Sequence, residues 1–114
     1  MVKSTRYVPD RGDVVWLNLN PQAGHEQKGR RPALVISFRE FNKKVRLGLF
    51  CPITSTIKGY PFEVEVSGQK ITGCVLSDQV KSLDWSVRDI EYIEKLDDER
   101  LDDVIANILL LMRK

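Results

Sequence analysis

Nine consecutive residues, Gly24 to Pro32 (GHEQKGRRP), place the chain's only histidine among groups that transfer protons and bind anions. They include one carboxylate, Glu26, and three cations, Lys28, Arg30 and Arg31. The glycines and the closing proline favour a loop. Because an arginine fork can hold two phosphate oxygens at once, this composition suits an anionic ligand that could also be cut. The alternative is an ordinary surface loop, whose backbone is hydrated and whose side chains are therefore polar.

An RNA backbone is one such ligand. Cleaving it without a metal requires a base for the 2′-OH, stabilisation of charge on the phosphorus, and protonation of the departing 5′-oxygen. Glu26 is a candidate base. A second predicted loop adds hydroxyls and a cation, at Thr54, Ser55, Thr56 and Lys58. Both loops border predicted strands that could hold them together, although the sequence alone does not show that they meet.

Three further observations bear on this site. His25 could titrate near neutral pH, but an ordinary loop histidine is the favoured interpretation. Arg31 directly precedes an apolar strand that begins with Pro32. Its backbone should therefore be well fixed, and its guanidinium should be held in a defined direction. Aromatic side chains could stack on bases or belong to the core, at Trp16, Phe38, Phe41 and Tyr60.

Composition indicates one soluble globular domain spanning residues 1–114, with 42% apolar and 30% charged residues. The sequence contains no apolar run long enough to span a membrane and no signal peptide, so a cytoplasmic protein is expected. Cys51 and Cys74 lie in apolar segments and should be core residues. With a single histidine and no close cysteine pair, no metal site or cofactor is expected.

Charge is distributed unevenly along the chain. Residues 1–77 contain twelve Lys/Arg against six Asp/Glu, whereas residues 78–114 contain six against ten. This asymmetry favours a basic surface built by the first two-thirds of the chain, as a polyanion would require. Folding could also interleave the two parts and cancel the field.

Apolar runs and alternation predict a mostly β chain with turn-like connections, including Glu40–Lys44 and the SGQK segment. Only the end, residues 97–114, has a helical pattern, with a stripe at Leu101, Val104, Ile105, Ile108 and Met112. The predicted strands are 13–19, 32–38, 45–53, 62–67, 71–84 (one or two strands) and 89–96, with a long polar loop from Asn20 to Arg31. Together they predict a small, strongly bent β-barrel with a C-terminal helix.

Three segments resemble the MazF/PemK-type toxins, the endoribonuclease half of type II toxin–antitoxin pairs. They are GDVVW (12–16), GHEQKGRRPALV (24–35) and LSDQVKSLDW (76–85), which occur here in the family's order and spacing. The resemblance covers roughly residues 6–86. It implies a homodimer of SH3-like barrels, of the CcdB/PemK type, that cleaves single-stranded mRNA at short sequences without metal or cofactor. The products would be a 2′,3′-cyclic phosphate and a 5′-OH.

The resemblance also implies roles for individual residues. The family's catalytic arginine falls on Arg31, its catalytic threonine on Thr54 and its loop glutamate on Glu26. Positions along the RNA path fall on Gln27, Ser55, Lys58 and Gln79. We expect Arg31 to clamp the charged phosphorane, Glu26 to act as the base and Thr54 to orient the phosphate.

The implied partner is a small antitoxin whose acidic, disordered tail occupies the basic groove. Three alternatives remain open from the residues. A toxin of the same architecture can bind DNA gyrase without catalysis, and a single-stranded RNA-binding module would need only the basic face and aromatics. A peptide-binding SH3-like domain would need an exposed aromatic groove.

Overall fold

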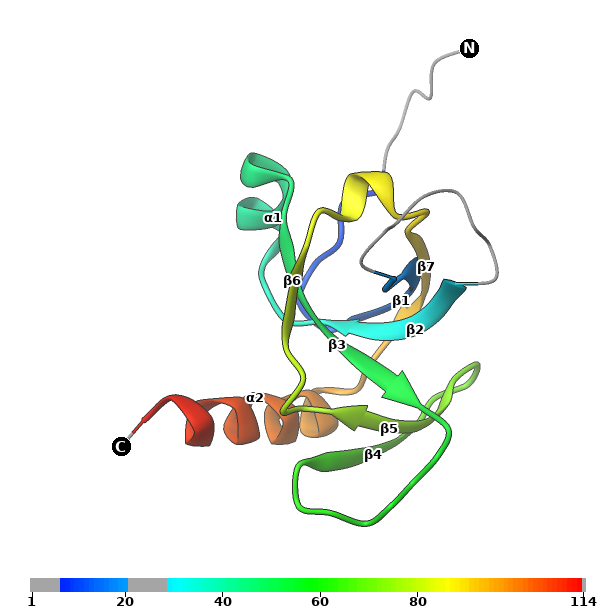
Figure 1. The fold of residues 1–114 in the computed structure, drawn as a ribbon, viewed down its shortest axis with the longest axis vertical. Helices are drawn as coiled ribbons and strands as arrows, with labels where there is room; N and C mark the ends of the chain where they lie inside the picture. The colour runs from blue at the N-terminus through cyan, green and yellow to red at the C-terminus, as the bar shows by residue number, and fades with distance from the viewer. Residues whose placement is uncertain (1–6, 21–28, 114) are drawn as a thin grey trace.

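The computed structural model describes residues 7–20 and 29–113, and it consists mainly of one strongly curled antiparallel sheet (Figure 1). The order of the strands is β4-β5-β3-β2-β1-β7, and β6 pairs with β3. This confirms a mostly β, half-barrel architecture. The strands are β1 (Asp13–Asn18), β2 (Arg30–Val35), β3 (Gly48–Thr54), β4 (Glu63–Ser67), β5 (Thr72–Leu76), β6 (Lys81–Leu83) and β7 (Glu91–Lys95).

The central strands β1, β2 and β3 are buried on both faces. On one face Val14, Leu34 and Ile53 belong to a core cluster that packs under helix α2 (Asp98–Met112). On the other face Leu17 and Phe50 join a second cluster beneath the short 3₁₀ helix η2 (Trp85–Val87). Burial on both faces explains why these strands are continuous apolar runs and do not alternate.

Helix α2 confirms the predicted C-terminal helix. The side chain of Asp97 accepts a hydrogen bond from the backbone N–H of Arg100 and caps the helix N-terminus. Val104 is fully buried, and Leu101, Ile105 and Ile108 pack against the same cluster. Met112, which we expected in this stripe, is instead 75% exposed, and Leu109, Leu110 and Leu111 are also exposed, because the C-terminal part of the helix extends past the sheet (Figure 1).

A second helix, α1 (Arg39–Val45), lies where we predicted only a turn, so the expectation of a single helix was wrong. Although the helix is mostly polar, its residue Asn42 is fully buried. The Asn42 side chain donates to the carbonyls of Pro9 (2.8 Å) and Ser37 (3.0 Å) and accepts from the Ser37 hydroxyl (2.6 Å). Tertiary hydrogen bonds therefore stabilise a segment that has no apolar stripe of its own.

Strand boundaries differ from the prediction mainly at β2. We placed Arg31 at the end of a loop, but Arg30 and Arg31 pair with Asn18 and Leu17 of β1 and belong to the strand. The strand also ends at Val35 and not at position 38. The apolar pattern could not reveal this start, because the first two strand residues are charged. The predicted segment 71–84 forms two strands, β5 and β6.

Both cysteines are fully buried, which confirms their assignment to the core. Burial, with the nearby Asp78 carboxylate, raises the pKa of the Cys51 thiol to about 12, so this thiol stays protonated at neutral pH. Within the described residues, no helix is both long and apolar enough to cross a membrane.

Candidate functional site

An open cavity of about 560 Å³ lies where the start of β2, the end of β3 and the turn between β4 and β5 come together. Figure 1 shows these three segments on the same side of the molecule. Its lining combines polar and cationic side chains with prolines and aliphatic residues. The lining residues are Leu19, Arg31, Pro32, Pro52, Ile53, Thr54, Ser55, Lys70, Ile71 and Thr72.

Arg31 and Thr54 line the same cavity from two neighbouring strands. Strands β2 and β3 pair antiparallel with Ala33 opposite Pro52 and Leu34 opposite Cys51. Beyond Pro52 strand β3 pairs with β5, where Thr54 lies opposite Cys74, while Arg31 pairs with Leu17 of β1. The two strands therefore present a guanidinium and a hydroxyl to one cavity.

Neighbouring Arg30 points to the opposite face, because successive side chains of a strand alternate. It forms an ion pair with Glu91 of β7 (2.5 Å), and its side chain is only 16% exposed. Arg31, by contrast, is exposed and lines the cavity. Of the two arginines in the doublet, Arg31 is thus the one that can reach a ligand there.

The Thr54 hydroxyl acts as an acceptor in its local hydrogen bond. Its oxygen accepts from the backbone N–H of Thr56 (3.1 Å), so its own proton remains available to a ligand oxygen. Strand β5 presses closely against this residue: a Cβ at Gly73 would lie 2.3 Å from the Thr54 carbonyl oxygen. Glycine at position 73 therefore permits the close approach that fixes the Thr54 backbone.

The loop after β3 is held by a strand carboxylate. The Glu63 side chain accepts from the backbone N–H groups of Lys58 (3.1 Å) and Gly59 (2.7 Å). The Tyr60 hydroxyl donates to Asp78 (2.8 Å), and this hydrogen bond raises the pKa of Tyr60. Lys58 is thereby presented from an ordered loop, although it does not line the cavity.

The remaining predicted residues fall into three groups. Ser55 lines the cavity beside Thr54. Gln79 is exposed in the connection from β5 to β6 and lies outside the cavity lining. Glu26 and Gln27, like His25, lie outside the described residues.

Sequence reasoning missed Lys70, which lines the cavity together with Arg31 and Thr54. It lies in the SGQK segment, which was correctly predicted to be a turn but was given no role in the site. A lysine at the tip of a turn carries little signal by itself, since its approach to β2 and β3 arises from the curl of the sheet. Across residues 7–20 and 29–113, no three His, Cys, Asp or Glu side chains gather as a metal site requires.

Comparison with known proteins places these observations in a family. The family model for the PemK-like, MazF-like toxin of type II toxin–antitoxin systems matches residues 10–112. The endoribonuclease toxin MazF of Escherichia coli (strain K12) is 50% identical over 84 residues, covering 74% of this chain and 76% of that protein. The endoribonuclease EndoA of Bacillus subtilis (strain 168) is 33% identical over 100 residues, covering 82% of this chain and 85% of EndoA.

Solved structures agree with this similarity. The crystal structure of MazF from Deinococcus radiodurans superposes with a TM-score of 0.85 at 46% identity, covering 94% of this chain and 98% of that chain. A MazE–MazF crystal structure from the same organism superposes with a TM-score of 0.84 at 40% identity, covering 94% of this chain and 97% of that chain. On sequence and fold, the chain belongs to the PemK-like, MazF-like toxin family of type II toxin–antitoxin systems.

Proposed function

We propose that this chain is the endoribonuclease toxin of a toxin–antitoxin pair and cleaves single-stranded mRNA without a metal ion, at specific sequences. The placement of Arg31 and Thr54 in the lining of one cavity carries this proposal. Two strands offer a charged fork and a hydroxyl proton to that cavity, as a developing phosphorane requires. Cleavage would arrest translation and growth.

The proposed reaction is an internal displacement at phosphorus. Glu26 removes the proton of the 2′-OH, the 2′-oxygen attacks the phosphorus, and the bond to the 5′-oxygen breaks. The products are a 2′,3′-cyclic phosphate and a 5′-OH. Arg31 holds two phosphate oxygens and shares a proton with the departing 5′-oxygen late by a hydrogen bond. Because a guanidinium is a poor acid near neutral pH, the proton that completes the 5′-OH comes from water, and Glu26 returns its own proton to water. Thr54 donates its hydroxyl proton to a phosphate oxygen.

Binding outside the reaction centre is assigned to the flanking loops. Gln27, Ser55, Lys58 and Gln79 contact the RNA on either side of the scissile phosphate. Single-stranded RNA exposes base edges that a duplex hides, so loops can read it directly. The protein works in the cytoplasm, where mRNA is translated, and as a homodimer.

The partner proposed for this chain is an antitoxin of the MazE type, because the MazF of Deinococcus radiodurans crystallises in a MazE–MazF complex. An acidic, disordered tail would occupy the same cations that hold RNA phosphates. Inhibition is then direct competition for Arg31 and its neighbours.

A gel assay tests the enzyme and its centre together. Purified protein is incubated with a long single-stranded RNA in excess EDTA, alongside Arg31→Ala and the matched control Arg100→Ala, which removes a partly exposed arginine of α2 outside the cavity lining. Discrete fragments with 5′-OH ends are expected from the wild type and the control, and none from Arg31→Ala. Intact RNA on several sequences would overturn the proposal and favour a gyrase-binding toxin or a non-catalytic RNA-binding module.

A further inference from the structure

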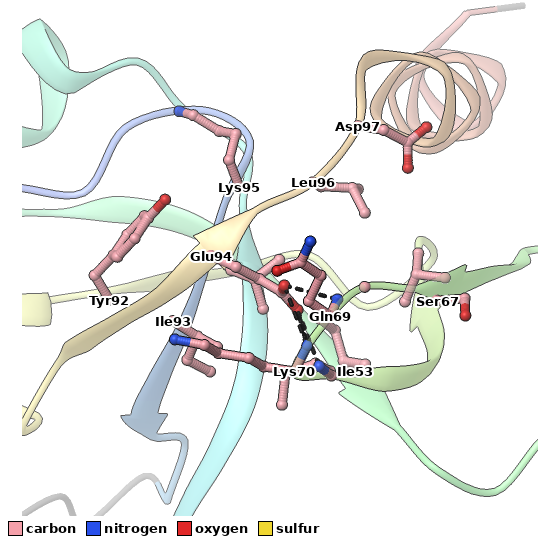
Figure 2. Close-up of a pocket in the computed structure, with 14 residues that line it drawn as sticks. Ile53, Ser67, Gln69, Lys70, Tyr92, Ile93, Glu94, Lys95, Leu96 and Asp97 are labelled. Atoms are coloured by element: carbon pink, nitrogen blue, oxygen red, sulfur yellow. Dashed lines mark hydrogen bonds between the residues drawn. The ribbon is translucent and has the colours of Figure 1, made fainter.

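The Glu94 carboxylate on β7 is enclosed by backbone donors of the β4–β5 turn. One oxygen accepts from the N–H groups of Gln69 (3.0 Å) and Lys70 (3.2 Å). The other accepts from Lys70 (3.2 Å) and Ile71 (2.9 Å). Figure 2 shows the carboxylate pointing at this turn. Strands β4 and β7 are the first and last strands in the order of the sheet. This one side chain therefore links the two ends of the curled sheet.

The turn is shaped to receive this carboxylate. A Cβ at Gly68 would lie 2.3 Å from one Glu94 oxygen and 2.8 Å from the carboxyl carbon. Gly68 has no positive φ, so the reason for glycine here is space and not backbone conformation. An alanine at this position would push the carboxylate out of its ring of donors.

Lys70 is the residue of this turn that reaches the candidate site. Its side chain is exposed and lines the cavity that contains Arg31 and Thr54. Among the described residues its ammonium forms no ion pair within 4.0 Å, and neither does the guanidinium of Arg31. Two cations thus border one cavity, and a phosphate-bearing ligand would neutralise both.

We propose that Lys70 binds a backbone phosphate of the RNA next to the one held by Arg31, and that Glu94 is the residue that positions it. This inference rests on the proposed endoribonuclease function and adds a residue to its substrate-binding surface. Glu94 acts only through the backbone: four hydrogen bonds fix the turn, and the turn aims the lysine. Without them Lys70 would sit on a mobile hairpin tip, and ordering it on binding would weaken the contact.

The decisive readout is the salt dependence of RNA binding. Each phosphate contact to a single strand contributes about 0.7 to the slope of log K against log salt. The probe is a single-stranded oligoribonucleotide that contains the mapped cut site with one 2′-deoxy sugar there, which removes the nucleophile and prevents cleavage. Lys70→Ala should reduce the magnitude of the slope by about 0.7 and weaken binding roughly two- to fivefold.

Two variants control for unspecific effects. Lys70→Arg keeps the charge and should keep the slope. Arg113→Ala removes a cation at the C-terminal end of α2, on the far side of the molecule from the β4–β5 turn (Figure 1). This variant should leave the slope of log K against log salt unchanged. A slope that stays at the wild-type value in Lys70→Ala would overturn the inference while cleavage by the wild type still supports the endoribonuclease.

Glu94 is tested by Glu94→Gln and by Gly68→Ala, which displaces the carboxylate without removing it. Both should raise KM more than they lower kcat and should reduce the salt slope in the direction of Lys70→Ala. Melting temperature is measured for each variant. If both variants have a lower melting temperature but keep the full salt slope, Glu94 only stabilises the fold, and the inference that it positions Lys70 is wrong. A wild type that neither binds nor cleaves RNA would overturn the proposed function itself.

Discussion

The cationic and hydroxyl groups proposed to bind RNA are held in two different ways. Arg31 and Thr54 lie within two central strands, where Arg31 pairs with Leu17 of β1 and Thr54 pairs with Cys74 of β5. Lys58 and Lys70 project from connections whose backbone N–H groups are held by single carboxylates, Glu63 and Glu94. The strand pair resists displacement because moving it breaks a ladder and two core clusters, whereas each carboxylate can be removed by one substitution.

This difference matches two different demands. Stabilising a transition state requires groups fixed within a fraction of an ångström, because small misplacements cost large factors in rate. Binding flanking phosphates tolerates more movement, since a point charge such as lysine acts without strict geometry. We therefore expect strand substitutions to change kcat and carboxylate substitutions to change mainly KM.

The largest effect is expected from Arg31 itself. Arg31→Ala should lower single-turnover cleavage about 10²–10³-fold, the typical loss for one preorganised donor. Arg31→Lys keeps the charge but loses the fork and should recover only part of the rate. Rapid-quench measurement on the mapped RNA checks both, and a lysine variant at full rate would show that charge alone is sufficient.

Gly73→Ala tests the close packing of β5 against β3 at Thr54 without changing a reacting group. The added methyl would meet the Thr54 carbonyl oxygen at 2.3 Å, so β3 and β5 must separate. Overpacking of this kind typically costs about 1–3 kcal/mol of stability, and the shift of Thr54 should reduce kcat roughly tenfold or more. Denaturant unfolding and cleavage well below the melting temperature separate the two effects. Unchanged kcat would mean that Thr54 need not be held so closely.

A smaller effect is expected from Glu63→Gln. The amide keeps the shape but loses the charge that holds the N–H groups of Lys58 and Gly59. We expect KM for RNA to rise roughly two- to fivefold with kcat nearly unchanged, as for a partly exposed charge contact. Glu65→Gln is the matched control, because it makes the same change two residues along the strand on the same face. An equal effect of both variants would indicate that net charge matters and that the hydrogen bonds accepted by Glu63 do not.

The smallest effect concerns the hydrogen bond from Tyr60 to Asp78, which raises the pKa of the Tyr60 phenol. The neutral phenol is the donor, so this bond is present below pH about 10, the ordinary tyrosine value, and is lost as the pH rises through the higher pKa of the folded protein. An absorbance titration of wild type minus Tyr60→Phe should place this phenolate above pH 10. A midpoint at or below 10 would mean that the bond is not maintained in solution.

Much of the fold could be predicted from local patterns. The apolar runs of β1, β2 and β3 and the capped helix α2 are strong signals because they report burial directly. Helix α1 could not be predicted, since its anchor, Asn42, depends on carbonyls of Pro9 and Ser37 that only the folded chain brings near.

The candidate site was predictable in part for the same reason. Arg31 and Thr54 stand at the ends of apolar segments, and resemblance to a family singled them out. Their meeting at one cavity depends on strand pairing and on the curl of the sheet, which sequence periodicity does not specify. Lys70 had no local signal, because the curl of the sheet and the Glu94 carboxylate bring its turn to the cavity.

The ion pair between Arg30 and Glu91 has a consequence for folding fidelity. A slip of β2 by one residue would turn all of its side chains to the other face, which both core clusters oppose. It would also separate Arg30 from Glu91 and turn Arg31 away from the cavity, which would leave the chain inactive. The ion pair forms only in the alignment in which Arg31 lines the cavity, and so it adds to the preference for the active alignment.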